Sequence, residues 1–234
     1  IIKEKTMGIN FSSGSMSSPP DPGVNQQIIR KYTSNATYSA HSTVKYIQVH
    51  CIGGGGGSSS ATSLSGEESQ DSRGFGGAGA GAYSIGTYTR TGGSFGGNIV
   101  VGGGGEGGQD EENTFFGGSN GGDSKFQPTG SYSGTEGTLI GERGQGASAG
   151  TQSFGEGGEV QSGTQFVSFA GEDGETKTGS GGEHLEATSG RGGHAPLTSG
   201  RTYGKGADGR SGAEEGAGND GTKGVVFIYE YRAS

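Results

Sequence analysis

Glycine accounts for 57 of the 234 residues, about one residue in four, where about 7% is usual. Each ordered glycine loses more backbone entropy than any other residue. Only 34 residues are Leu, Ile, Val or Phe, and burying so few large apolar side chains offsets little of that cost. We therefore expect an ordered form of this chain to be held by backbone hydrogen bonds between closely packed glycine segments, by neighbouring subunits, or by both.

Charge and apolar patterning exclude two classes of partner. Sixteen basic and 24 acidic residues give a net charge of −8, and the chain has no basic stripe that could neutralise nucleic-acid phosphates. No run of 18 apolar residues occurs, so we expect no membrane insertion. Cys51 is the single cysteine, which excludes an intramolecular disulfide.

The chain divides into two parts by composition. Residues 1–41 contain few glycines and include Pro19-Pro20-Asp21-Pro22, which predicts an extended N-terminal arm with a proline-rich hinge. Residues 42–234 form the predicted glycine-rich β domain. Glycine interrupts almost every segment beyond Gly53, so essentially no helix is expected.

Two apolar segments at the ends of this domain have the pattern of strands. Residues 43–52 alternate so that the apolar side chains lie mainly on one face, and residues 225–231 are similarly rich in β-branched and aromatic residues. We predict that these two strands lie side by side and close an all-β sandwich with polyglycine-II-like segments. Residues 82–88 and 98–101 are predicted to form a hairpin-like pair, and residues 166–169 a further strand.

The glycines before the last strand repeat with a period of three. A period of three is typical of a polyproline-II-type helix, in which every third residue lies on one face. The pattern predicts one bare edge along which a neighbouring backbone packs closely. The residues of this edge, interrupted only by Glu215, are Gly206, Gly209, Gly212, Gly218, Gly221 and Gly224.

The chain shows no convincing catalytic or metal-binding motif. Gly79-Ala80-Gly81 and Gly144-Gln145-Gly146 begin like dinucleotide-binding loops, but neither joins a strand to a helix. In the P-loop-like stretch 200–205, the next residue is Gly206, where Ser or Thr would hold magnesium. The histidines lack the spacing of a metal site; they are His41, His50, His184 and His194. We therefore predict no enzyme activity, no metal and no cofactor.

Two further patterns leave alternatives open. The acidic cluster Asp110-Glu111-Glu112 favours a solvated loop tip over a calcium site, which would need oxygens from elsewhere in the chain. Asn10 and Asn35 match the glycan acceptor pattern, although one or two chance matches are expected in a chain so rich in Ser and Thr.

Three stretches carry a resemblance to a known family. They are an apolar strand that ends in a glycine run (44–57), an interior section (76–105) and a closing strand (224–229). Together they resemble the glycine-rich domain of bacteriophage tail-fibre and tail-tip adhesins. The resemblance implies an extracellular or virion protein that assembles with copies of itself or other components. It also implies polyglycine-II helices packed in a sandwich and loops at one end that bind a bacterial surface glycan or outer-membrane protein.

A second hypothesis is that the chain is a self-assembling subunit of an extracellular filament, linked through its N-terminal arm. Four large apolar residues, Ile1, Ile2, Ile9 and Phe11, lie on this arm, and the proline-rich segment separates them from the domain. Adding a strand to an exposed sheet edge of a neighbour would cover them. An ice-binding or cell-wall protein is less favoured because the flat, regular repeat that it needs is not evident.

Overall fold

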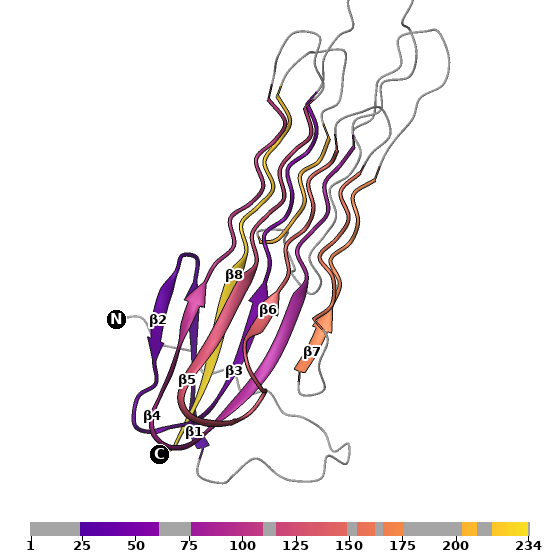
Figure 1. The fold of residues 1–234 in the computed structure, drawn as a ribbon. Coiled ribbons are helices and arrows are strands. Elements are labelled where there is room, and N and C mark those ends of the chain that lie inside the picture. The colour runs from indigo at the N-terminus through magenta and orange to yellow at the C-terminus, as the bar shows by residue number, and fades with distance from the viewer. Residues whose placement is uncertain are drawn as a thin grey trace, which may run out of the picture.

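The computed structural model describes residues 24–60, 76–109, 116–148, 154–161, 166–175, 203–209 and 217–233. Within these residues every regular element is a β-strand, as predicted, and none is a helix able to span a membrane (Figure 1). The strands are β1 Val24–Tyr32, β2 Ala36–Ser39, β3 Val44–Ile52, β4 Tyr83–Val100, β5 Ser124–Gly134, β6 Leu139–Gly141, β7 Phe166–Phe169 and β8 Val225–Ala233.

All strand pairs are antiparallel and belong to one sheet of order β1-β8-β3-β4-β5-β6, with β2 and β7 each paired to β4. Pairing of β3 with β8 confirms that residues 43–52 and 225–231 are neighbours. The sheet is open, however. β1 continues it beyond β8, so β3 and β8 lie in its interior and do not seal an edge.

The sheet forms two layers because β4 and β5 bend together. Their register breaks between Arg90 and Phe95, and Gly93 (φ 31°) and Gly130 (φ 86°) have the left-handed backbone that such a bend requires. The first half of β4 pairs with β3, and its second half pairs with β2. The first layer contains β1, β8, β3, β7 and the first half of β4, and the second layer contains β2, β6 and the second half of β4. Residues 82–88 and 98–101 are therefore not a hairpin, and that prediction is wrong.

The two layers enclose one apolar core. Val49 and Ile228 point inward from the first layer, and the rings of Tyr88 and Phe126 lie 5.2 Å apart between the layers. Burial of each such side chain contributes about 1.5–3 kcal/mol. Gly97 makes room for this packing, since a β-carbon there would lie 2.5 Å from the Phe126 ring. The buried residues of the core are Tyr38, Val44, Ile47, Val49, Cys51, Tyr88, Phe95, Ile99, Phe126, Leu139, Val226 and Ile228.

The described part of the predicted arm belongs to this sheet. β1 pairs with β8 along its length, and β2 pairs with the second half of β4. Between these strands, Asn35 accepts a hydrogen bond from the Val101 N–H through Oδ1 (2.8 Å). Residues 1–23, which include Ile1, Ile2, Ile9, Phe11 and Asn10, lie outside the described residues.

A buried carboxylate stabilises the β1–β8 side of the sheet. The Glu230 side chain is fully buried, and it accepts hydrogen bonds from Arg30 Nε and from Arg232 Nη2 (2.6 Å). Burial alone would raise the pKa of this carboxyl, but the hydrogen bonds from the two guanidinium groups outweigh that effect and hold the pKa below its ordinary value.

Candidate functional site: the glycine-rich bundle

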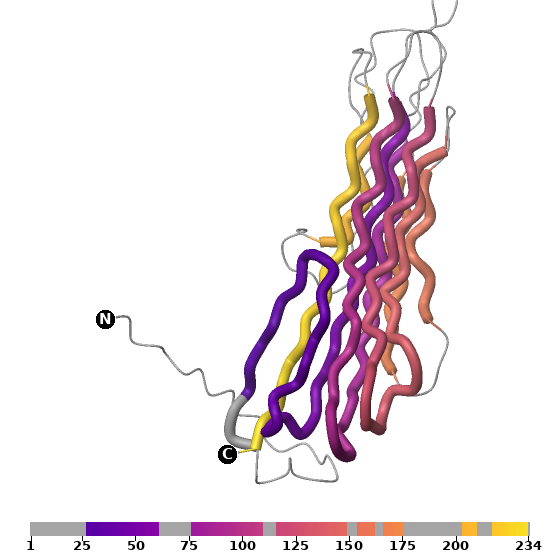
Figure 2. The backbone as a smooth tube through the Cα atoms, turned by 60° about the vertical axis from the view of Figure 1, so that its left-hand side comes forward, coloured from indigo at the N-terminus to yellow at the C-terminus, as the bar shows by residue number. Residues whose placement is uncertain are grey.

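Beyond the sheet, the chain continues from the strands into straight glycine-rich segments that run side by side (Figure 2). We call them rods 1 to 9 in chain order. None contains a strand, yet their backbones are regularly bonded to one another. Within the described residues, rods 1 to 9 are 53–60, 76–82, 101–109, 116–123, 142–148, 154–161, 170–175, 203–209 and 217–224.

Rod 1 lies at the centre of the bundle and is buried along its whole length. Its N–H groups donate in rotation to three neighbours: Gly53 to rod 2, Gly54 to rod 4 and Gly55 to rod 9, after which the order repeats. Its carbonyls accept from rods 3, 5 and 8. Six neighbours around one threefold-repeating chain is the packing expected of polyglycine II.

Rod 2 repeats this arrangement next to rod 1. Every N–H from Gly77 to Ala82 donates to another rod, in the rotating order rod 7, rod 8, rod 5, and all of its residues are buried. Each backbone hydrogen bond contributes about 0.5–1.5 kcal/mol net. As the composition predicts, the glycine segments are bonded to one another through their backbones.

Glycine is required in rod 1 because the rods approach each other so closely. A β-carbon on Gly53, Gly55 or Gly57 would lie 1.9–2.0 Å from a backbone carbonyl oxygen of a neighbouring rod. No real β-carbon tolerates such a distance, so any side chain would push the rods apart.

Most of the glycines predicted to form a bare edge also face a neighbouring backbone. A β-carbon would stand 2.0–2.3 Å from a carbonyl oxygen at Gly206, Gly218, Gly221 and Gly224. Gly209 is buried, and Gly212 lies outside the described residues. These glycines do not form one continuous edge, because rods 8 and 9 run antiparallel, with Gly204 N bonded to Lys223 O and Thr222 N to Lys205 O.

Three antiparallel rod pairs share one side-chain contact that we call the clasp. In rods 9 and 3, Gly218 and Gly221 donate to the carbonyls of Gly108 and Gly105, while Asp220 Oδ1 accepts from Gly107 N at 2.8 Å. The same three bonds recur between rods 4 and 5 and between rods 7 and 6. There the accepting oxygens belong to Asn120 (2.9 Å from Gly146 N) and Asp173 (2.8 Å from Gly157 N).

The clasp has a sequence signal that the period of the glycines does not reveal. The rod that carries the accepting side chain has the sequence Gly-x-Asx-Gly, at 118–121, 171–174 and 218–221. Its partner reads Gly-(Glu or Gln)-Gly-(Gly or Ala), at 105–108, 144–147 and 155–158. The bonded residues are separated by 113, 26 and 16 positions in the three pairs, so glycine spacing alone does not connect the two patterns.

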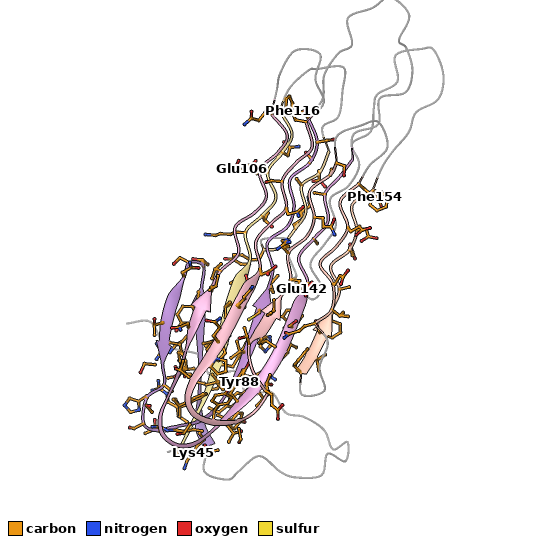
Figure 3. The ribbon with its side chains drawn as sticks, viewed as in Figure 1. Lys45, Tyr88, Glu106, Phe116, Glu142 and Phe154 are labelled. Atoms are coloured by element: carbon orange, nitrogen blue, oxygen red, sulfur yellow. The ribbon has the colours of Figure 1, made fainter. Side chains whose placement is uncertain are left out.

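Four breaks in the described chain begin and end at the bundle end that is far from the sheet. At this end, Ser60 N donates to Phe116 O (2.9 Å), which brings rods 1 and 4 together just where both leave the described region. Figure 3 shows Phe116 and Phe154 at this far end and Glu142 at the junction with the sheet. The segments that join rods here are 61–75, 110–115, 149–153 and 210–216.

Among the described residues, the side chain of Cys51 is buried and that of His50 is hydrogen-bonded to its neighbours. Burial raises the pKa of the Cys51 thiol and lowers that of His50 to about 4. His50 Nε2 donates to Gln48 Oε1 (3.1 Å), and Nδ1 accepts from Tyr83 Oη. In the part of the chain that the structure describes, no three His, Cys, Asp or Glu residues are grouped to hold a metal ion. Outside it lie Asp110-Glu111-Glu112, His184, His194 and residues 200–202.

Comparison with known proteins assigns no family to this arrangement: no family model matches the chain, and no curated protein matches it. The described geometry provides a set of fixed attachment points. Rods locked through their backbones hold the ends of four connecting segments at fixed positions, about one rod length beyond the sheet.

Proposed function

We propose that this chain is a non-enzymatic adhesion protein of the phage tail-fibre or tail-tip type, acting outside the cell or on a virion. In this proposal the bundle is a rigid support, and the segments at its far end contact the host surface. The observation that supports the proposal is the common placement of the rod ends that flank 61–75, 110–115, 149–153 and 210–216. Binding residues are commonly placed on loops that a rigid scaffold positions.

The composition of these segments suits contact with a polar surface. Residues 61–75 read ATSLSGEESQDSRGF, and the three shorter segments contribute further Glu, Asp, Asn, Thr, Gln, Arg and Ser. Hydroxyl, amide and carboxylate groups are the partners that sugar hydroxyls and polar protein loops require. A bacterial surface glycan or an outer-membrane protein is therefore the proposed target.

Replacing the four segments with Gly-Ser linkers of equal length tests this function. Fluorescently labelled protein is incubated with a panel of bacterial strains and with purified lipopolysaccharide. We expect the parent to bind at least one surface and the replaced protein to keep its melting temperature but lose binding. Lys45→Ala and Thr91→Ala, which change exposed residues of the sheet away from the bundle, serve as controls and should bind like the parent. Undiminished binding after the replacement would contradict the proposal.

A second candidate function is a filament subunit joined through the N-terminal arm. One observation favours it: β1 lies at the margin of the sheet, and its first residue, Val24, directly follows residues 1–23, the part of the arm outside the described residues. The arm is thereby attached at the sheet end of the molecule, opposite to the far end of the bundle, so assembly and surface binding would not compete for the same place.

A further inference from the structure

The outward side of the first sheet layer carries an ordered array of side chains, here called the outer face. Strand pairing sets its rows across β1, β8, β3, β4 and β7. One row contains Ile29, Tyr229 and Gln48, aligned by pairing of Tyr229 with both of the others. On the same face, Ile52, Tyr83 and Val225 lie in the row of Phe169 and are buried. The remaining residues, which make up the outer face as the term is used below, are Gln27, Ile29, Lys31, Tyr46, Gln48, His50, Ile85, Thr87, Thr89, Val167, Phe169, Phe227, Tyr229 and Tyr231.

The outer face is apolar and aromatic, and much of it is accessible. Ile29 is 58% exposed, Val167 54% and Phe169 39%, while the tyrosines are half-buried. It contains no carboxylate, and its one cation, Lys31, lies at the margin with Nζ 4.6 Å from the centroid of the Tyr203 ring. Enrichment in Tyr and Phe with few charges is the composition of the core of a protein interface.

The rings of the outer face are already fixed in place. Tyr46 and Tyr231 stack with centroids 4.3 Å apart, and His50 lies 4.7 Å from Tyr229. Gln27 Nε2 donates to Tyr231 Oη at 3.0 Å. Side chains held in this way lose little entropy when a partner covers them, which favours binding.

The size of the outer face indicates what kind of partner fits. With strands about 4.8 Å apart and rows about 6.7 Å apart, the accessible rows cover roughly 400 Å². A stable interface between two globular proteins takes about 800 Å² from each partner. The outer face is therefore about half the size needed for a globular partner, and it suits a single extended segment.

One segment of this chain has matching chemistry. In residues 1–16, Met7, Ile9 and Phe11 fall on one side of an extended backbone, because strand side chains alternate. The chain that follows residues 1–16 enters the sheet at Val24, beside the margin of the outer face. Between them, residues 17–23 contain three prolines, which favour an extended spacer of about 20 Å. An extended spacer of this length would let residues 1–16 reach a neighbouring copy.

We propose that the outer face binds residues 1–16 of a second copy of this chain. Each copy then offers one arm and one receiving face, so contacts of this kind join copies head to tail. This inference rests on the second candidate function, and it specifies the surface through which the subunits connect.

Two full-length double variants and their mixture test the proposal. Ile9→Asp with Phe11→Asp alters the arm, and Ile29→Lys with Val167→Lys alters the outer face at exposed positions. By light scattering coupled to size exclusion, the parent is expected to form oligomers that grow with concentration. Each double variant alone should be monomeric, and an equimolar mixture should yield dimers, because one intact arm meets one intact face. Val100→Lys with Phe154→Lys changes exposed apolar residues elsewhere and should assemble like the parent.

A second measurement identifies the contact directly. A peptide of residues 1–16 with benzophenone-alanine in place of Phe11 is irradiated with the parent chain, and cross-links are expected on outer-face residues of β1, β8, β3, β4 or β7. A monomeric parent, parent-like assembly of either double variant, a mixture that stays monomeric, or cross-links confined to other elements would each overturn the proposal. The surface-binding assay is independent of these outcomes, because it depends on the far end of the bundle.

Discussion

The carbonyl oxygen of Lys205 lies 2.0 Å from the position that a β-carbon of Gly55 would occupy. That oxygen cannot easily move, because it accepts from Thr222 N at 2.9 Å while the Lys205 N–H donates to Thr222 Oγ1 at 2.6 Å. Rods 1, 8 and 9 are thus locked at a spacing that excludes even one methyl group.

The first prediction is that Gly55→Ala strongly destabilises the protein. Overpacking a well-packed interior costs about 1–3 kcal/mol, and we expect more than about 3 kcal/mol here because the clash is with bonded backbone. Urea unfolding measures the change in free energy.

Gly103→Ala is the matched control for this substitution. Gly103 belongs to rod 3, is exposed, and has no atom within 4 Å of its added β-carbon. Alanine should leave the stability unchanged or raise it by up to about 1 kcal/mol by restricting the unfolded chain. Equal effects of the two substitutions would show that close packing of the rods is not what requires glycine.

A second prediction concerns the clasp. Asp220→Ala removes the oxygen that accepts from Gly107 N, and leaving this N–H without its partner should cost about 1–2 kcal/mol. Asp220→Asn keeps Oδ1 and should cost much less, just as Asn120 occupies the equivalent position in rod 4. Thermal denaturation compares the two variants, and a loss as large for Asn as for Ala would argue against the clasp.

The third prediction is a loss of stability in acid that depends on Glu230. Because its pKa is lowered in the folded protein, its stabilising effect is complete above the ordinary glutamate value of about 4.3 and disappears as the pH falls through the folded pKa. Glu230→Gln should lower the melting temperature at pH 7 and flatten its decline at low pH. A variant whose melting temperature follows the parent's pH dependence would exclude Glu230 as a contributor.

Part of this structure could be predicted from sequence because the signals are local. Alternation in β3 and β8 marks both strands, and their apolar content requires them to be buried together. A three-residue period marks a polyglycine-II backbone wherever glycine is dense. The short rods 6 and 7 belong to the same packing although their period is weak, because their partners supply the regularity.

Other features depend on contacts that no local pattern reveals. The bend of β4 is accompanied by a bend of its partner β5, a strand further along the chain. β1 lacks clear alternation, since Arg30 on its inward side pairs with the buried carboxylate of Glu230. The clasp joins Asp220 to Gly107 across more than a hundred residues.

Hydrogen exchange at the amides of rods 1 and 2 tests the central claim most directly. These rods contain no strand, yet every N–H from Gly53 to Ser58 and from Gly77 to Ala82 is bonded to another rod. We predict that these amides exchange as slowly as those of β3 and β8, with protection approaching the free energy of global unfolding. Exchange near the rate of an unfolded chain, while β3 and β8 stay protected, would contradict the account of a rigid, backbone-bonded bundle.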